Sequence, residues 1–434
     1  MIGFNKGNEI MAEEEYHAIL VGIARDADIS YSMDELSGLA EAAGVIVLGQ
    51  MIQNLETPNR ATYIGKGKVE ELSEMVANME ADTVIFNDEL SGLQMRNLED
   101  ALNVRIIDRT VLILDIFATR ADSAEGKLQV ELAQLQYRLP RLTGFGTSLS
   151  RQGASMGGRG VGIGTRGPGE KKLETDKRHI TKRINEIKTE MEDVQRTRKV
   201  QRAHREKSGL PLVALVGYTN SGKSALMNRF LEISEKPEKM VLEKDMLFAT
   251  LDTRQRKIQL PDNREFLLID TVGFVSKLPH HLIKAFKATL EEVAEADLLL
   301  HIVDASYEHH DFHIDVTNKV LKEIGAGHKE KLLVLNKIDL LPEATSETSK
   351  SMAVSISAKY GNNIDRLIEI ICDKLFKDHV VAKLLIPFSR GDVSSYLCDK
   401  TEVISMEFTE HGTEFKVKLD KGDYQRLRDY EIKE

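Results

Sequence analysis

Cysteine is scarce in this sequence, which has two, Cys372 and Cys398, among 434 residues. A chain of this size with so few cysteines does not depend on disulfides, and this fits a reducing cytosol. Long apolar runs are missing too, since no stretch approaches the roughly 18 residues of a membrane-spanning helix. The first ten residues lack the basic start, apolar stretch and cleavage site of a secretory leader. We therefore expect a cytoplasmic protein that has no membrane partner.

The composition is that of a globular protein, with 41% hydrophobic and 29% charged residues. These values exclude a fully disordered chain, a collagen-like repeat and a polytopic membrane protein. The net charge of -10 conceals a basic segment, because residues 138–207 contain 18 Lys and Arg against 8 Asp and Glu. Such a segment either binds a polyanion or forms a solvated, charge-rich helix, and charge alone leaves both interpretations open.

The pattern of short apolar runs predicts a multidomain α/β protein, of two to four domains at about 150 residues each. A tail at 1–12 precedes a small parallel α/β domain at 13–120. Residues 209–376 repeat the strand–helix alternation in a larger α/β domain, and 377–434 suggest a small α+β domain. The expected strands lie at 18–23, 45–48, 83–87, 104–108, 212–216, 266–269, 298–303, 332–335, 352–356, 380–386, 403–408 and 414–419.

Residues 121–208 carry a different pattern, with apolar residues spaced alternately by three and four positions. This spacing predicts the seam of a coiled coil between two helices, formed by Leu128, Leu132, Leu135, Leu139, Leu142, Leu173, Ile180, Ile184, Ile187, Met191 and Val194. Pro140 is expected to bend or end the first helix. The loop at 144–169 holds 10 of the 30 glycines. We expect it to stay disordered until it meets a partner.

One motif carries phosphate chemistry: Gly217, Tyr218, Thr219, Asn220, Ser221, Gly222, Lys223 and Ser224 match G-x-x-x-x-G-K-[ST] between an apolar strand and an amphipathic helix. The backbone N–H groups of such a loop surround a β-phosphate, and the following helix directs its positive end at the same anion. Lys223 adds a charge at the β- and γ-phosphate oxygens, and Ser224 offers a hydroxyl to Mg²⁺.

Four further elements follow in the order that a GTP-binding domain requires. Thr250 is placed to give its hydroxyl to Mg²⁺ and its N–H to the γ-phosphate, and Gly273 is placed to sense that phosphate. The carboxylate of Asp339 can accept two hydrogen bonds from guanine but not from adenine. The complete candidate set comprises Phe248, Ala249, Thr250, Leu251, Asp252, Asp270, Thr271, Val272, Gly273, Asn336, Lys337, Ile338, Asp339, Ser357, Ala358 and Lys359. We assign Lys223, Thr250 and Gly273 to catalysis.

Phe274 stands where Ras-like switches carry a glutamine that orients the attacking water. A phenyl ring makes no such hydrogen bond, so intrinsic hydrolysis should be slow and an external surface should complete the site. The alternative is that Phe274 only packs, and another side chain orients the water.

The chain resembles the HflX family of ribosome-associated GTPases over roughly residues 15–375. The motifs that carry this resemblance are Tyr63-Ile64-Gly65-Lys66-Gly67-Lys68 with Glu70-Glu71-Leu72, Asp108-Arg109-Thr110 with Leu114-Asp115-Ile116-Phe117, Arg166-Gly167-Pro168-Gly169-Glu170 with Leu173, Glu174 and Asp176, and residues 247–252. Phe274 agrees with the family. Thr253 departs from it, because a proline often stands at that position in the family.

The resemblance implies a Mg²⁺-dependent, cytosolic GTPase that binds the large ribosomal subunit, is stimulated by it and splits idle or stalled ribosomes under stress. The basic hairpin fits rRNA, where contacts are chiefly to phosphates, and Arg151, Arg159 and Arg166 are the expected contacts. We expect a monomer when the protein is free. A competing hypothesis is an rRNA-binding assembly or storage factor whose nucleotide is mainly a structural ligand. A metabolic phosphotransferase is disfavoured, since no acceptor motif is present.

Two further motifs carry weaker signals. Lys66 and Lys68 could contact a phosphate at a second nucleotide site, but the first turn of a helix is the simpler interpretation. His309 and His313 lie one helical turn apart, as metal ligands do, although no third ligand is evident.

Overall fold

The structure is a computed structural model that describes residues 16–25, 29–154, 168–234, 248, 254–277, 287–341, 353–377, 379–419 and 421–432. Its contacts divide the chain into two compact units. The first unit comprises residues 1–194 together with 276–285, and the second comprises 195–275 and 286–434. A short stretch of the expected GTP-binding domain therefore belongs to the N-terminal unit.

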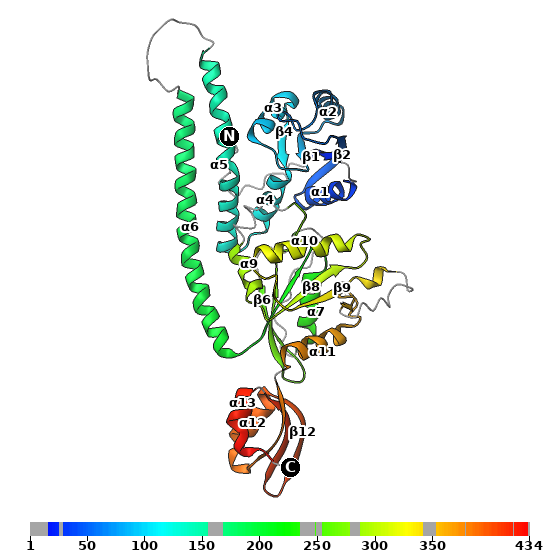
Figure 1. Cartoon of the computed structure of the whole chain (residues 1–434), viewed down its shortest axis with the longest axis vertical. Helices are drawn as coiled ribbons and strands as arrows, with labels where there is room; N and C mark the ends of the chain where they lie inside the picture. The colour runs from blue at the N-terminus through cyan, green and yellow to red at the C-terminus, as the bar shows by residue number, and fades with distance from the viewer. Residues whose placement is uncertain are drawn as a thin grey trace, which may run out of the picture. The chain divides into compact units, whose positions relative to one another are not determined.

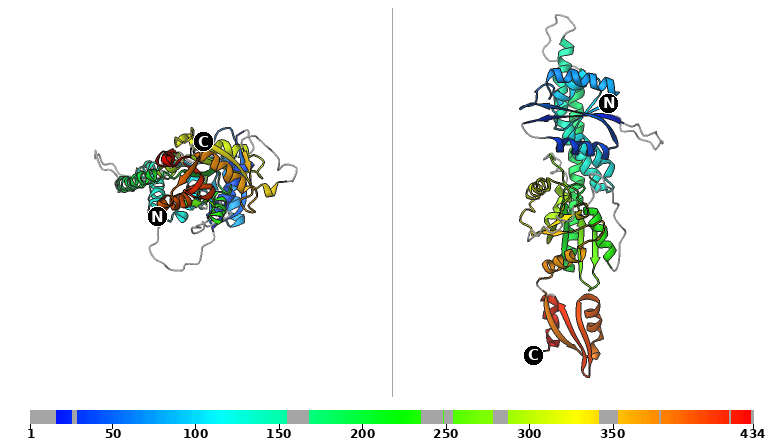
Figure 2. Two further views of the ribbon diagram at one scale, coloured as in Figure 1. Left: turned by 90° about the horizontal axis from the view of Figure 1, so that it is seen from below. Right: turned by 90° about the vertical axis from the view of Figure 1, so that its right-hand side faces the viewer.

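The first unit is built on a four-stranded parallel sheet in the order β2-β1-β3-β4. Its strands are β1 (Tyr16–Ala24), β2 (Val45–Asn54), β3 (Thr83–Phe86) and β4 (Arg105–Asp108). Its helices are α1 (Ser30–Ala42), α2 (Lys66–Met79), α3 (Gly92–Leu102) and α4 (Arg109–Arg120). Helix α1 contacts α4 and α2 contacts α3, so helices cover both faces of the sheet (Figures 1 and 2). The predicted small parallel α/β fold is confirmed.

Two long helices follow, α5 (Ala124–Ala154) and α6 (Pro168–Ser208). Eight of the predicted seam residues pack into one apolar cluster, namely Leu128, Leu132, Leu135, Leu139, Ile180, Ile184, Ile187 and Met191. Figure 1 shows the two helices side by side as a hairpin. The spacing of three and four therefore predicted the packing of this hairpin correctly.

The expectation that Pro140 ends the first helix was wrong, because α5 continues through it to Ala154, whereas a bend at Pro140 stays a prediction. The predicted loop was wrong in part, since residues 144–154 are helical. Side chains on either side of the proline are held by other elements, since Tyr137 donates a hydrogen bond to Asp108 at 2.6 Å and Arg141 donates to the Leu90 carbonyl at 2.8 Å. The rest of the predicted loop, 155–167, lies outside the described residues.

The second unit contains a six-stranded sheet in the order β10-β9-β8-β5-β7-β6, parallel except for β6 at one edge. Its strands are β5 (Leu212–Gly217), β6 (Arg254–Gln259), β7 (Glu265–Asp270), β8 (Leu298–Asp304), β9 (Lys331–Asn336) and β10 (Ala353–Ser355). Its helices are α7 (Lys223–Ile233), α9 (Lys287–Ala294), α10 (His310–Glu323) and α11 (Ile364–Leu375). Buried residues of α7 and α11 share one apolar core with the sheet.

The C-terminal residues form a three-stranded antiparallel sheet in the order β11-β13-β12, as the predicted α+β fold requires. Its strands are β11 (Val380–Ile386), β12 (Glu402–Thr409) and β13 (Gly412–Leu419). Helices α12 (Gly391–Lys400) and α13 (Lys421–Leu427) supply its remaining core residues. Among the described residues, no helix is both long and apolar enough to cross a membrane.

Candidate nucleotide site

The predicted phosphate-binding loop connects β5 to α7, and its conformation requires glycine at two positions. Gly217 has φ +153°, and a Cβ there would lie 2.2 Å from the carbonyl oxygen of Ile302. Gly222 has φ +91°, and a Cβ there would lie 2.1 Å from Nδ2 of Asn336. A side chain at either position would displace the neighbouring strand end or the asparagine. The loop is therefore set by close backbone approach, as the motif predicts.

Lys223 begins α7, and its ammonium group lies inside the loop. Its Nζ donates to the carbonyl oxygens of Gly217 at 3.1 Å and Tyr218 at 2.6 Å. Burial lowers the pKa of this lysine to about 8, while the charge of Asp270 opposes that shift. The lysine is thus mainly protonated at pH 7. It places a positive charge where the motif predicts the phosphates.

Oxygen donors meet beside this lysine, at the end of β7. The hydroxyl of Ser224 donates to Oδ2 of Asp270 at 2.7 Å, and Asp270 is fully buried. A hydroxyl and a carboxylate are the hard oxygen ligands that Mg²⁺ prefers. Two more hydroxyls, of Thr219 and Ser221, are buried without a hydrogen-bond partner among the described residues. Unsatisfied donors beside a buried ammonium fit phosphate oxygens, and so this donor set suits a magnesium nucleotide.

The segment after β7 pairs with the phosphate-binding loop through its backbone. Phe274 N–H donates to the Gly217 carbonyl at 3.1 Å, and Thr219 N–H donates to the Phe274 carbonyl at 2.8 Å. A Cβ on Gly273 would lie 2.7 Å from Cγ2 and 2.8 Å from Cα of Thr219, so only glycine fits there. The Phe274 side chain is buried. This agrees with the alternative that Phe274 packs.

The predicted guanine-reading residues form one hydrogen-bonded network. Asn336 is buried at the end of β9, where its Nδ2 donates to the Ser221 carbonyl at 2.9 Å. Its Oδ1 accepts from the N–H of Ala358, also at 2.9 Å. The buried hydroxyl of Ser357 donates to Oδ1 of Asp339 at 2.6 Å and so orients that carboxylate. Three motifs that are separate in the sequence are thus joined around one loop.

The comparisons with known proteins cover nearly the whole chain. Residues 30–118 match the family described as GTP-binding GTPase N-terminal, and 120–205 match the GTP-binding GTPase Middle Region. Residues 212–337 match the family described as 50S ribosome-binding GTPase. A curated GTPase HflX of Caldanaerobacter subterraneus subsp. tengcongensis is 48% identical over 424 residues, which are 98% of this chain and 96% of that relative. The chain belongs to the HflX family of GTPases.

Another curated relative agrees with this assignment. GTPase HflX of Escherichia coli is 40% identical over 94% of this chain and 95% of its own length. A solved GTP-binding protein of the archaeon Sulfolobus solfataricus, in complex with GDP, is 24% identical and covers 83% of this chain and 99% of its own, with a TM-score of 0.44. As a member of the HflX family, the chain is a GTPase, and the predicted activity is confirmed.

Two sets of contacts in this HflX-family site could not be predicted from its sequence motifs. Arg229 on α7 donates to the carbonyls of Ala358 at 3.2 Å and Lys359 at 2.7 Å, and thereby holds the last motif in place. The Tyr218 ring stacks on His313 of α10 at 3.8 Å, and His313 stacks in turn on Tyr307 at 4.6 Å. The spacing of His309 and His313 suggested metal ligands, but stacking is the role that the structure gives to His313.

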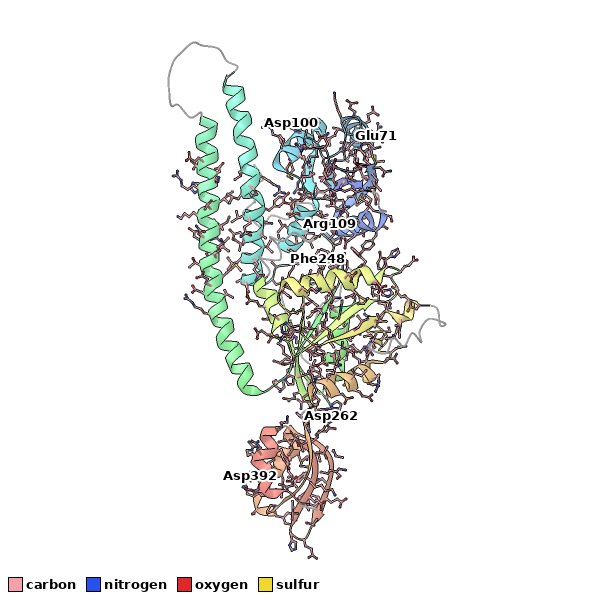
Figure 3. The ribbon with its side chains drawn as sticks, viewed as in Figure 1. Glu71, Asp100, Arg109, Phe248, Asp262 and Asp392 are labelled. Atoms are coloured by element: carbon pink, nitrogen blue, oxygen red, sulfur yellow. The ribbon has the colours of Figure 1, made fainter. Side chains whose placement is uncertain are left out.

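Several predicted site residues of this HflX-family chain cannot be placed. Ala249, Thr250, Leu251 and Asp252 lie outside the described residues, whereas Phe248 before them is buried with φ +55° (Figure 3). Arg151 lies in α5, but its side chain is outside the description, as are Arg159 and Arg166 entirely. In the N-terminal unit, Lys66 begins α2 after Gly65, whose N–H donates to Gln53. Lys66 and Lys68 therefore lie in the first turn of α2, as the simpler interpretation predicts.

Proposed function

We propose that this HflX-family GTPase binds the large ribosomal subunit and couples GTP binding and hydrolysis to that association. The observation that carries the proposal is the match of residues 212–337 to the family described as 50S ribosome-binding GTPase, over a loop whose buried lysine and hydroxyls suit a magnesium nucleotide. The finer role is the splitting of idle or stalled ribosomes under stress. The protein acts in the cytoplasm and is a monomer when free.

The residues of the nucleotide site have the following proposed roles. Ser224 and Thr250 would hold Mg²⁺, which supplies neutralisation of phosphate charge. Lys223 stabilises the negative charge that develops on the transferred phosphoryl group. The Asp339 carboxylate, oriented by Ser357, reads the guanine edge. Gly273 positions the backbone that faces the γ-phosphate.

The hairpin supplies the contact with rRNA. It carries most of the excess of basic residues between 138 and 207, and long-range attraction to phosphates needs only such charge. Arg151, Arg159 and Arg166 are the proposed contacts within it. Affinity for RNA falls as salt rises. Neutralising three phosphate contacts should make the slope of log affinity against log salt less steep by about 2 units.

The test measures steady-state GTP hydrolysis with and without purified large subunits, at matched Mg²⁺ and salt. We expect large subunits to stimulate turnover and small subunits not to. Absence of stimulation, with tight GTP binding intact, would refute the coupling and favour an rRNA-binding assembly or storage factor. Conversion of intact ribosomes into subunits, followed by sedimentation, then tests the finer role.

A triple variant tests the hairpin. Arg151→Gln, Arg159→Gln and Arg166→Gln together should weaken subunit binding and leave the affinity of the free enzyme for GTP unchanged. The matched control neutralises three exposed cations elsewhere, Lys322, Arg366 and Lys416. Equal subunit affinity of both triple variants at several salt concentrations would contradict a specific role of the hairpin loop.

A further inference from the structure

The N-terminal unit is a parallel α/β sheet of the kind that binds ligands at the carboxyl ends of its strands. In this protein, residues 276 and 277 of the chain itself contact the groups at those strand ends. In the strand order β2-β1-β3-β4, β2 lies on one side of β1, and β3 and β4 lie on the other. The switch point of this parallel sheet therefore lies between β1 and β3. In such sheets, ligands bind at the carboxyl ends of the strands beside the reversal. Asn87 and Asp88 follow β3 there, and Arg109 follows β4. Ser276 and Lys277 belong to the same unit. Ser276 accepts a hydrogen bond from Arg109, and Lys277 donates one to Asp88.

Ser276 is bound by a buried ion pair. The side chains of Arg109 and Glu35 are 2% and 3% exposed and form a salt bridge. Arg109 Nη2 donates to the Ser276 hydroxyl at 3.1 Å and to its carbonyl at 3.3 Å. The Ser276 hydroxyl in turn donates to Glu35. A buried guanidinium needs its acceptors, so the serine is part of what stabilises the pair.

The polar network extends on both sides of this serine. Arg109 Nη1 donates to Oδ1 of Asn87 at 3.0 Å, which fixes the guanidinium from the opposite side (Figure 3 labels Arg109). Lys277 forms an ion pair of 2.7 Å with Asp88, and the Tyr63 hydroxyl donates to the same carboxylate. The consecutive residues Ser276 and Lys277 are therefore bound by Arg109, which follows β4, and by Asp88, which follows β3. Arg109 and Tyr63, which lie in two of the motifs that carry the resemblance to the HflX family, both belong to this network.

The contacts of Ser276 bear on the nucleotide site because Ser276 is close in sequence to the segment that pairs with the phosphate-binding loop. Ser276 lies two residues after Phe274, whose backbone pairs with Gly217 and Thr219 of the phosphate-binding loop. Two residues span at most about 7 Å even when fully extended. Movement of Gly273 and Phe274 toward a γ-phosphate must therefore strain or release Ser276. GTPase switch segments are ordered by γ-phosphate contacts and relax when these are lost.

We propose that Arg109 and Glu35 are positioning residues that hold Ser276, and through it keep Phe274 paired with the phosphate-binding loop in competition with the γ-phosphate. Docking of Ser276 and binding of the γ-phosphate are then negatively coupled. By linkage, weakening one strengthens the other by the same factor. GDP has no γ-phosphate, so its affinity is independent of the pair.

Ser276→Ala is the sharpest test, because it removes one hydroxyl and leaves the buried ion pair in place. We expect the variant to bind a non-hydrolysable GTP analogue about three- to tenfold more tightly, a gain within the usual range of allosteric coupling. Its affinity for GDP should stay within twofold of the wild type. Isothermal titration of the full chain with each nucleotide measures both values. Ser276→Thr keeps a hydroxyl and should restore the wild-type ratio of the two affinities.

Ser91→Ala is the matched control, since it removes a serine hydroxyl that caps α3 in the same unit without touching Ser276. It should leave the ratio of the two affinities unchanged. Glu35→Gln should raise the analogue affinity, and combining it with Ser276→Ala should add little, because both changes weaken one contact. An unchanged ratio in Ser276→Ala, equal changes for both nucleotides, or weaker binding of the analogue would each overturn the proposal. None of these measurements involves ribosomes, so they are independent of the proposed partner.

Discussion

Asn336 offers the most direct test of how the nucleotide site is assembled. Its buried amide donates to the Ser221 carbonyl and accepts from the Ala358 N–H, both at 2.9 Å. Asn336→Ala removes both bonds and leaves a buried acceptor and a buried donor. Each such loss costs about 1–2 kcal/mol in a folded protein. We therefore expect the variant to lose roughly 2–4 kcal/mol of folding free energy, even before a nucleotide binds.

Thermal unfolding followed by far-UV circular dichroism measures this loss. One kcal/mol shifts the midpoint by about 2–4 °C in a domain of 150–250 residues, so the transition that GDP stabilises should fall by roughly 4–16 °C. GDP affinity should fall as well, because the loop and the guanine-reading segment lose their alignment. The control is Asn318→Ala, whose exposed bond from Lys331 should be worth less than 1 kcal/mol. A midpoint for Asn336→Ala that matches this control would refute the reasoning.

Three further predictions follow from single residues of the same unit. Gly222→Ala places a Cβ 2.1 Å from Asn336, and GDP titration should show at least a roughly hundredfold loss of affinity, since backbone and loop both shift. GDP affinity should decline above pH 8 in the wild type, where Lys223 loses its proton, but stay level between pH 7 and 9 in Lys223→Arg, which keeps its charge. Burial lowers the pKa of His301 to about 4. As the pH falls, His301 therefore takes up its proton in the unfolded chain before it does so in the folded one. The free energy of unfolding of the wild type, measured in urea, should fall by about 3 kcal/mol between pH 6.5 and pH 4, and that of His301→Leu should fall by less.

The sequence predicted what depends on local pattern. Strands β5 and β8 are fully apolar or nearly so, because helices cover both faces of a parallel sheet, and their positions were predicted correctly. Strand β6 was missed, since it reads Arg-Gln-Arg-Lys-Ile-Gln. It lies at the edge of the sheet and pairs with one neighbour, so it needs few apolar residues. Edge strands of this kind leave little signal in hydropathy.

The nucleotide motifs were visible because glycine, lysine and asparagine are constrained at fixed spacings. Contacts between distant residues left no such signal. Arg229 meets Lys359 across 130 positions, and Glu35 meets Ser276 across 241. No periodicity links these pairs, and a serine or a glutamate is unremarkable in any single segment. Only the fold reveals that Ser276, next to the GTP-binding motif, completes a polar network in the N-terminal unit.

The membership of Ser276 and Lys277 in the N-terminal unit also bears on the order in which the molecule is made. Protein synthesis delivers the four strands of the first sheet within 108 residues, yet the residues that satisfy Arg109 and Asp88 follow only after β5 and β7 have been synthesised. At about 5–20 residues per second, that is a delay of many seconds. During this interval Arg109 and Glu35 are without the serine that they contact in the complete chain. The N-terminal unit therefore gains residues 276–285 only after most of the nucleotide site has been synthesised.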